Sequence, residues 1–208
     1  MSDRAGDYIV GLFGAEDALL SSLREEADRS GLPPIAISAD EGRLLQVLLT
    51  AINARRVLEV GTLGGYSAIC MARALPPGGK LLSIEIEDAH ATFARRYVDR
   101  AGLSDRIEVR VGRALDVLPS LDGEKFDAMF LDADKEPLPT YFDWALRLVR
   151  PGGLIIGDNA LWGGKVYGEM SDEKTRAVRG FNRRMASDPR VLGIIVPTHD
   201  GVAVAVVR

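Results

Sequence analysis

The chain has 208 residues, of which 47% are hydrophobic and 27% are charged, and its formal net charge is -4. This length suffices for one domain with a sizeable core. The acidic balance gives no general attraction to nucleic acid or to an anionic membrane. The single cysteine, Cys70, excludes an internal disulfide framework and a cysteine-based zinc cluster. Its apolar helical surroundings predict that it is a packing residue.

The N-terminus carries no basic stretch followed by an apolar run, so no secretory signal is expected. No apolar run approaches the ~20 residues that are needed to span a bilayer. We therefore expect a cytoplasmic enzyme or binding protein.

The first third of the chain predicts helices. Residues 7–30 have apolar positions at helical spacing without proline, and the Gly-Leu-Pro-Pro segment at 31–34 ends that region. Ser38 and Glu41 then form a capping-box pattern that starts a second, strongly apolar helix.

Strand and helix patterns alternate from residue 56 onward. Strands are expected at 57–60, 81–86, 107–111, 126–131 and 153–157, and helices at about 66–75, 88–101, 113–120, 138–149 and 172–187. This alternation predicts a parallel sheet that is covered by helices on both faces. At the end of the chain, runs at 193–198 and 202–207 flank a turn sequence. They predict a hairpin, and therefore an antiparallel strand at the end of the sheet.

A glycine-rich turn follows the first strand. Gly61, Gly64 and Gly65 let the backbone approach a ligand closely. The spacing is not G-x-G-x-x-G, so the dinucleotide fingerprint is absent, and a tight strand-to-helix turn alone would also explain the glycines. Two nearby carboxylates favour a ligand-binding turn over a purely structural one. Glu59 would suit a cationic group such as an ammonium, and Glu85 at the end of the second strand could accept hydrogen bonds from two ribose hydroxyls.

Polar residues also follow two later strands. Asp132 comes after the run 126–131, and Asp158 and Asn159 come after the run that ends near residue 156. Open α/β sheets place their chemistry at such strand ends. Three oxygen donors suit a hard divalent cation such as Mg²⁺. Lys135, one turn beyond Asp132, is a candidate base.

Five segments together resemble the cation-dependent O-methyltransferases that use S-adenosylmethionine, which include the catechol and caffeoyl-CoA O-methyltransferases. The segments are Val57-Leu-Glu-Val-Gly-Thr-Leu-Gly-Gly-Tyr-Ser67, Ser83-Ile-Glu-Ile86, Gly112-Arg-Ala-Leu-Asp116, Leu131-Asp-Ala-Asp-Lys135 and Gly157-Asp-Asn-Ala-Leu-Trp162. The resemblance runs from about residue 33 to the C-terminus. The last two segments are most similar to the caffeoyl-CoA and bacterial branch.

The resemblance implies roles for individual residues. The cofactor-binding set would be Glu59, Gly61, Gly65, Tyr66, Ser67, Glu85, Ala114, Asp132 and Ile37. Ile35 and Gly42 match the segment that closes over the cofactor from the N-terminal side. Asp132, Asp158 and Asn159 would bind the metal, and Lys135, with Asp132 beside it, would carry the catalysis. Two positions depart from the family pattern. Arg113 leaves the adenine edge less defined, and Ile35 replaces a common methionine.

Several other residues have plainer interpretations. We expect structural or solvent-facing roles for His90 and His199. Trp162 fits a wall of the acceptor site and core packing equally well. Arg176, Arg179 and Arg183 share a helical face, which predicts a solvated face, with contact to an anionic substrate as the alternative.

We therefore expect a single α/β domain over residues 1–208, with a helical cap at 1–55 and an α/β core at 56–208. The fold class is a doubly wound, seven-stranded, mostly parallel Rossmann-like sheet with a C-terminal antiparallel hairpin. The expected activity is Mg²⁺-dependent methyl transfer from S-adenosylmethionine to a catechol-like small molecule, by a homodimer. The alternatives are a methyltransferase acting on hydroxyuridine in tRNA, an NAD-dependent oxidoreductase, and a non-catalytic binding protein.

Overall fold

The computed structural model describes residues 3–169 and 172–208, and the chain divides into two compact units, Met1–Val117 and Leu118–Arg208. Seven strands form a mostly parallel sheet. The first unit carries them in the order β3-β2-β1, and the second carries them in the order β4-β5-β7-β6. The predicted seven-stranded sheet is confirmed. Among the helices of the described residues, none is long and apolar enough to cross a membrane.

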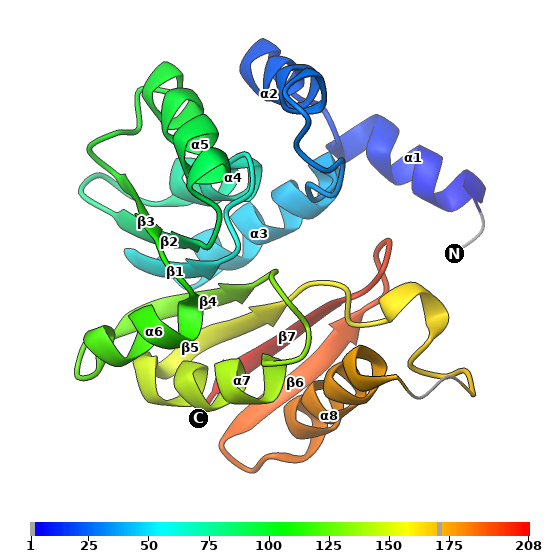
Figure 1. The fold of residues 1–208 in the computed structure, drawn as a ribbon. Helices are drawn as coiled ribbons and strands as arrows, with labels where there is room; N and C mark the ends of the chain where they lie inside the picture. Colours follow the sequence, from blue (N-terminus) through cyan, green and yellow to red (C-terminus); the bar gives the residue numbers. More distant parts are fainter. Residues whose placement is uncertain (1–2, 170–171) are drawn as a thin grey trace. The chain divides into compact units, whose positions relative to one another are not determined.

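The first unit combines three parallel strands with helices. Its elements are α1 (Asp3–Phe13), α2 (Ala18–Arg29), α3 (Ala39–Ala51), β1 (Arg56–Val60), α4 (Tyr66–Ala74), β2 (Lys80–Glu85), α5 (Asp88–Arg100), β3 (Ile107–Val111) and α6 (Ala114–Val117) (Figure 1). In the parallel pairings Val57 lies opposite Leu81, which in turn lies opposite Ile107. All three side chains are buried, as expected for strands that are covered on both faces.

The N-terminal region differs from the prediction, because the helix expected over residues 7–30 is two helices. Helix α1 ends at Phe13, and the backbone N–H of Gly14 donates to the carbonyl of Val10. Asp17 has an extended backbone and its side chain accepts a hydrogen bond from the N–H of Leu20 at 3.0 Å. An aspartate in this conformation caps a new helix and does not continue the old one.

Helix α3 begins as the capping pattern predicts. The Ser38 side chain accepts a hydrogen bond from the N–H of Glu41 at 3.3 Å. Leu45 and Leu49, one helical turn apart, are completely buried. This helix leads directly into β1, whose far end carries the glycine turn.

The second unit combines four strands with two long helices. Its elements are η1 (Leu118–Leu121), β4 (Phe126–Leu131), α7 (Leu138–Leu148), β5 (Val149–Gly157), η2 (Trp162–Gly164), α8 (Glu173–Ser187), β6 (Val191–Val196) and β7 (Val202–Val207). Strands β4 and β5 are parallel, whereas β7 is antiparallel to both β5 and β6. The predicted C-terminal hairpin is confirmed, in orange and red in Figure 1, although its first strand starts two residues earlier than expected. The helix expected at 113–120 is α6 followed by the short turn η1.

Close packing between α8 and β5 fixes the end of β5. Phe181 of α8 and Phe142 of α7 meet edge to face, with ring centroids 5.9 Å apart. A Cβ atom at Gly157 would lie 2.8 Å from the Phe181 ring. Only glycine therefore fits at this point of β5, directly before Asp158.

The serine cap of α3 predicts a measurable contribution to stability. Ser38→Ala should lower the free energy of unfolding by about 1 kcal/mol, because it removes the acceptor for the Glu41 N–H. Ser38→Asp retains a capping oxygen and should stay close to the wild-type value. Urea denaturation of the three proteins provides the comparison, and equal stability of the alanine and aspartate variants would contradict the role of the cap.

Candidate active site

The glycine turn of the first unit adopts a backbone that favours glycine. Gly61 and Gly65 have φ values of 99° and 86°, in the region that L side chains rarely occupy. A Cβ atom at Gly65 would also lie 3.2 Å from the Cβ of Ala94 in α5. The turn therefore brings the start of α4 close to α5. The structure places Gly61 and Gly65 where the sequence predicts a cofactor turn.

Glu59 is a fully buried carboxylate in the middle of a hydrogen-bond network. Its Oε1 accepts from Ser67 Oγ at 2.5 Å and its Oε2 accepts from Ser83 Oγ at 2.5 Å. Thr62 Oγ1 lies 2.5 Å from Ser83 Oγ. Because burying a charge without hydrogen bonds is costly, these hydroxyls keep the carboxylate in place. Sequence reasoning missed Ser83 and Thr62; the one signal was a serine inside an otherwise apolar strand.

Glu85 ends β2 and holds the turn together. Its Oε2 accepts hydrogen bonds from the backbone N–H groups of Thr62 and Leu63, at 3.1 and 2.7 Å. Its Oε1 accepts from the N–H of Glu87 at 3.0 Å and lies 3.6 Å from Nδ1 of His90. One carboxylate thus joins the glycine turn to the start of α5. His90, for which we expected a structural or solvent-facing role, lies beside this carboxylate.

Tyr66, Ile37 and Ala114 are all buried. The Tyr66 hydroxyl donates to Glu16 Oε1 at 2.6 Å. Burial, followed by this carboxylate, raises the pKa of Tyr66 above its ordinary value, so the phenol stays neutral. Ile35, in contrast, is 68% exposed.

Gly42 and Cys70 bring α3 and α4 together. A Cβ atom at Gly42 would lie 3.0 Å from Cys70 Sγ and 3.5 Å from Tyr66 Cε1. Burial raises the pKa of the Cys70 thiol to about 12, so this side chain is an uncharged packing residue, as predicted.

In the second unit, Asp132 and Asp158 stand at the ends of two paired parallel strands. Leu131 of β4 lies opposite Gly157 of β5, and the N–H of Asp158 donates to the carbonyl of Leu131 at 3.0 Å. Each aspartate directly follows one of these two residues. The structure therefore brings together the two carboxylates that the sequence predicts as metal ligands.

Asn159 donates two hydrogen bonds to the Asp158 carboxylate. Its backbone N–H donates to Asp158 Oδ1 at 2.6 Å, and its Nδ2 donates to Asp158 Oδ2 at 3.1 Å. Asn159 has a φ of 56°, a left-handed conformation that asparagine tolerates better than most residues. This backbone turns the chain sharply after β5.

Burial dominates the electrostatics of Asp132. It raises the pKa of Asp132 to about 6, while Lys135 lowers that pKa and the neighbouring Asp158 raises it. Lys135 is 5% exposed, and its Nζ lies 3.4 Å from Asp132 Oδ1.

The carboxylates of Asp132 and Asp158 suit a hard cation, because a positive ion would relieve the repulsion between them. Across residues 3–169 and 172–208, no three His, Cys, Asp or Glu side chains gather in a way that could hold a metal. The Asn159 amide oxygen is the further side-chain donor that the sequence predicts beside the two carboxylates.

The loop after β5 is fastened by Arg179. Its Nε donates to the carbonyl of Val166 at 2.8 Å, and its Nη2 donates to the carbonyls of Lys165 and Gly168 at 2.8 and 2.5 Å. The prediction of a solvated face was therefore wrong for Arg179, because this side chain is half-buried and its guanidinium binds three backbone carbonyls. Arg176 and Arg183 are exposed.

Trp162 lies beside Lys135, and Tyr141 bonds to the turn that carries this lysine. The Trp162 ring centroid lies 5.8 Å from Lys135 Nζ and 5.5 Å from Lys165 Nζ, and its buried Nε1 has no hydrogen-bond partner within the described part of the chain. The Tyr141 hydroxyl donates to Asp134 at 2.7 Å and so ties the turn after β4 to α7. His199 is exposed in the hairpin turn, as we expected.

Comparison with known proteins identifies relatives along nearly the whole chain. The model of the O-methyltransferase family matches residues 13–208. The chain is 43% identical to a catechol O-methyltransferase of Niastella koreensis, over 97% of this chain and 95% of that protein. It is 44% identical to a catechol O-methyltransferase of Mycobacterium tuberculosis, over 95% and 91%.

Solved structures agree with these sequence relatives. An O-methyltransferase from Bacillus cereus in complex with SAH is 38% identical and has a TM-score of 0.92, over 99% of this chain and 97% of that one. The O-methyltransferase TomG from Streptomyces achromogenes in complex with SAM is 40% identical and has a TM-score of 0.89, over 98% and 96%.

The Glu59 network predicts a stability cost for losing a donor. Ser83→Ala should lower the free energy of unfolding by about 1–3 kcal/mol, because a buried carboxylate loses one hydrogen bond. Ser104→Ala is a matched control, since Ser104 makes an exposed hydrogen bond to Asp99. Guanidinium denaturation measures both, and a Ser83→Ala protein as stable as the control would show that the network contributes little.

Proposed function

The chain belongs to the O-methyltransferase family and is an S-adenosylmethionine-dependent enzyme; from this premise, we propose that it methylates one oxygen of a catechol-like small molecule with the help of a divalent cation. The observation that carries the proposal is the pair of carboxylates, Asp132 and Asp158, at the ends of β4 and β5. Two relatives named catechol O-methyltransferase, at 43% and 44% identity, support the acceptor class. A homodimer in the cytoplasm is part of the same proposal.

The first unit is proposed to hold the cofactor. S-adenosylmethionine supplies a methyl group made electrophilic by its sulfonium. Glu59 would attract the ammonium of the cofactor, and Glu85 would accept hydrogen bonds from the ribose hydroxyls. The other proposed contacts come from Gly61, Gly65, Tyr66, Ser67, Ala114 and Ile37.

Glu59 is pre-oriented for this task because two serines fix both of its oxygens. Glu85 is only 6% exposed, and three backbone amides hold its carboxylate. Neither carboxylate has to reorganise much when a ligand arrives, which lowers the cost of binding.

The second unit is proposed to hold the cation and the acceptor. Three oxygen donors would come from Asp132, Asp158 and Asn159. Mg²⁺ prefers six oxygen ligands, so the remaining coordination positions are left for the acceptor and water. A bound cation lowers the cost of forming a phenolate and orients it. Two carboxylates balance the two charges of Mg²⁺. The acceptor would therefore meet a nearly neutral site.

Lys135 is the proposed base. Its Nζ is buried beside Asp132 Oδ1, at 3.4 Å, on the turn that directly follows the proposed metal ligand. In its neutral form the amine has a lone pair that can take the proton of the acceptor hydroxyl. The hydrogen bond from Tyr141 to Asp134 fixes the turn that carries Lys135.

The cation proposal predicts which acceptors react. With Mg²⁺, the enzyme should methylate catechols and leave matched single phenols unmodified, because a lone hydroxyl cannot supply two oxygens to the cation. EDTA should abolish turnover, and Asp158→Asn should reduce it strongly while SAH binding persists. Asp122→Asn removes an exposed ion pair with Arg147 and serves as the control. Methyl transfer from labelled S-adenosylmethionine is the assay, and EDTA-insensitive turnover would contradict the proposed metal site.

The base proposal predicts a kcat effect. Lys135→Met should lower kcat by about 10²–10⁴-fold, the usual contribution of general base catalysis, without weakening SAH binding. Lys125→Met changes an exposed lysine that donates to a backbone carbonyl, and it should remain close to wild type. Steady-state kinetics together with calorimetric SAH binding separate the two effects. A Lys135→Met enzyme with near-normal kcat would remove Lys135 from this role.

A further inference from the structure

Helix α2 packs directly on the glycine turn, although it lies far from that turn in the sequence. Leu23 is 1% exposed, and its Cδ2 lies 3.4 Å from the position that a Cβ atom would take at Gly64. The residue that follows it, Arg24, points to the same region. Both side chains belong to the first unit, as does the whole turn.

Arg24 joins three separate segments through one guanidinium. Its Nη2 donates to the carbonyl of Ile37 at 2.5 Å, and its Nε donates to Glu16 Oε1 at 2.6 Å. Its Cζ lies 3.9 Å from the centroid of the Tyr66 ring. The same Glu16 oxygen also accepts the Tyr66 hydroxyl. Arg24 therefore holds the Ile37 segment, Glu16 and the first residue of α4 in one arrangement.

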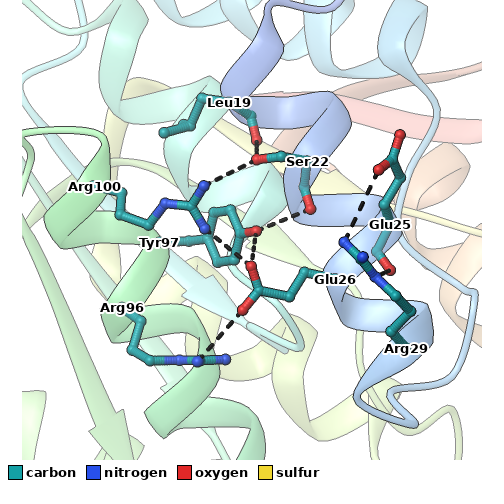
Figure 2. Close-up of polar contacts among 8 residues, drawn as sticks. All are labelled: Leu19, Ser22, Glu25, Glu26, Arg29, Arg96, Tyr97 and Arg100. Atoms are coloured by element: carbon teal, nitrogen blue, oxygen red, sulfur yellow. Dashed lines mark hydrogen bonds and ion pairs between the residues drawn. The ribbon is translucent and has the colours of Figure 1, made fainter.

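A second set of contacts fixes α2 against α5. Figure 2 shows Glu26 facing Tyr97, Arg96 and Arg100. The Tyr97 hydroxyl lies 2.6 Å from Glu26 Oε2 and 2.9 Å from the carbonyl of Ser22. Arg100 and Arg96 pair with the same carboxylate, at 3.0 and 3.4 Å. Helix α2 is thus held on α5, and Arg24 extends from a fixed support.

We propose that Arg24 is a positioning residue for S-adenosylmethionine. Arg24 holds the Ile37 segment and Tyr66 in the arrangement that the cofactor requires. This inference rests on the proposed cofactor site at the glycine turn. Arginine suits the task because its planar fork donates in several directions while its face stacks on an aromatic ring. Lysine carries the same charge but cannot make all of these contacts at once.

The test compares three α2 variants. Arg24→Met should weaken SAH binding by about tenfold to a hundredfold, as expected for losing charge-assisted hydrogen bonds. It should raise the KM for S-adenosylmethionine to a similar extent, while kcat at saturating cofactor and the KM for the acceptor change less than about threefold. Arg24→Lys should recover only part of the affinity. Arg29→Met is the matched control, because Arg29 is exposed in the same helix.

Hydrogen–deuterium exchange gives an independent readout without cofactor. Peptides that cover residues 35–38 should exchange faster in Arg24→Met than in wild type, whereas those of α5 should not change. If Arg24→Met fails to fold, folded Arg24→Lys decides the question with the same two measurements. Wild-type SAH affinity and wild-type exchange in the folded variant would overturn the role of Arg24. Failure of the wild-type protein itself to bind SAH would instead contradict the proposed cofactor site.

Discussion

Four carboxylates at or near strand ends impose the constraint on which the rest of the structure depends, because charge removed from water is tolerated only with hydrogen bonds or opposite charge. Those of Glu59, Glu85 and Asp158 are buried, and that of Asp132 is half-buried. In the first unit the chain supplies that compensation itself. Ser67 and Ser83 satisfy Glu59, and the backbone of the glycine turn satisfies Glu85. In the second unit, burial and Asp158 raise the pKa of Asp132, and Lys135 offsets only part of this effect. This difference between the units explains why a cation belongs to the proposed chemistry of the second.

The chain belongs to the O-methyltransferase family, and two other functions agree less well with its sequence and structure. An oxidoreductase is disfavoured because the dinucleotide fingerprint is missing from the glycine turn. A tRNA substrate finds no support in a net charge of -4, since nucleic-acid binding depends on phosphate neutralisation. The proposed small acceptor, bound through two oxygens, agrees better with two carboxylates and an amide at the strand ends.

Local patterns predicted most of the fold, because alternation and capping depend on neighbouring residues. The Ser38 cap, the parallel pairs within each unit and the C-terminal hairpin are examples. The break near Asp17 was missed, since a capping aspartate resembles an ordinary helix residue when only periodicity is considered. The contacts of Arg24 and Arg179 with backbone carbonyls were also not predictable. A carbonyl has no sequence identity, and these partners are 11 to 14 residues away along the chain.

We propose that Asp132, Asp158 and Asn159 hold the cation that the reaction requires. A crystal structure of the protein with Mn²⁺, SAH and a catechol tests it most directly, because Mn²⁺ gives an anomalous signal that identifies its position. We expect one strong anomalous peak, from an ion that is bound by oxygens of all three side chains and by both oxygens of the catechol. Density for the catechol with no anomalous peak beside these residues would contradict it.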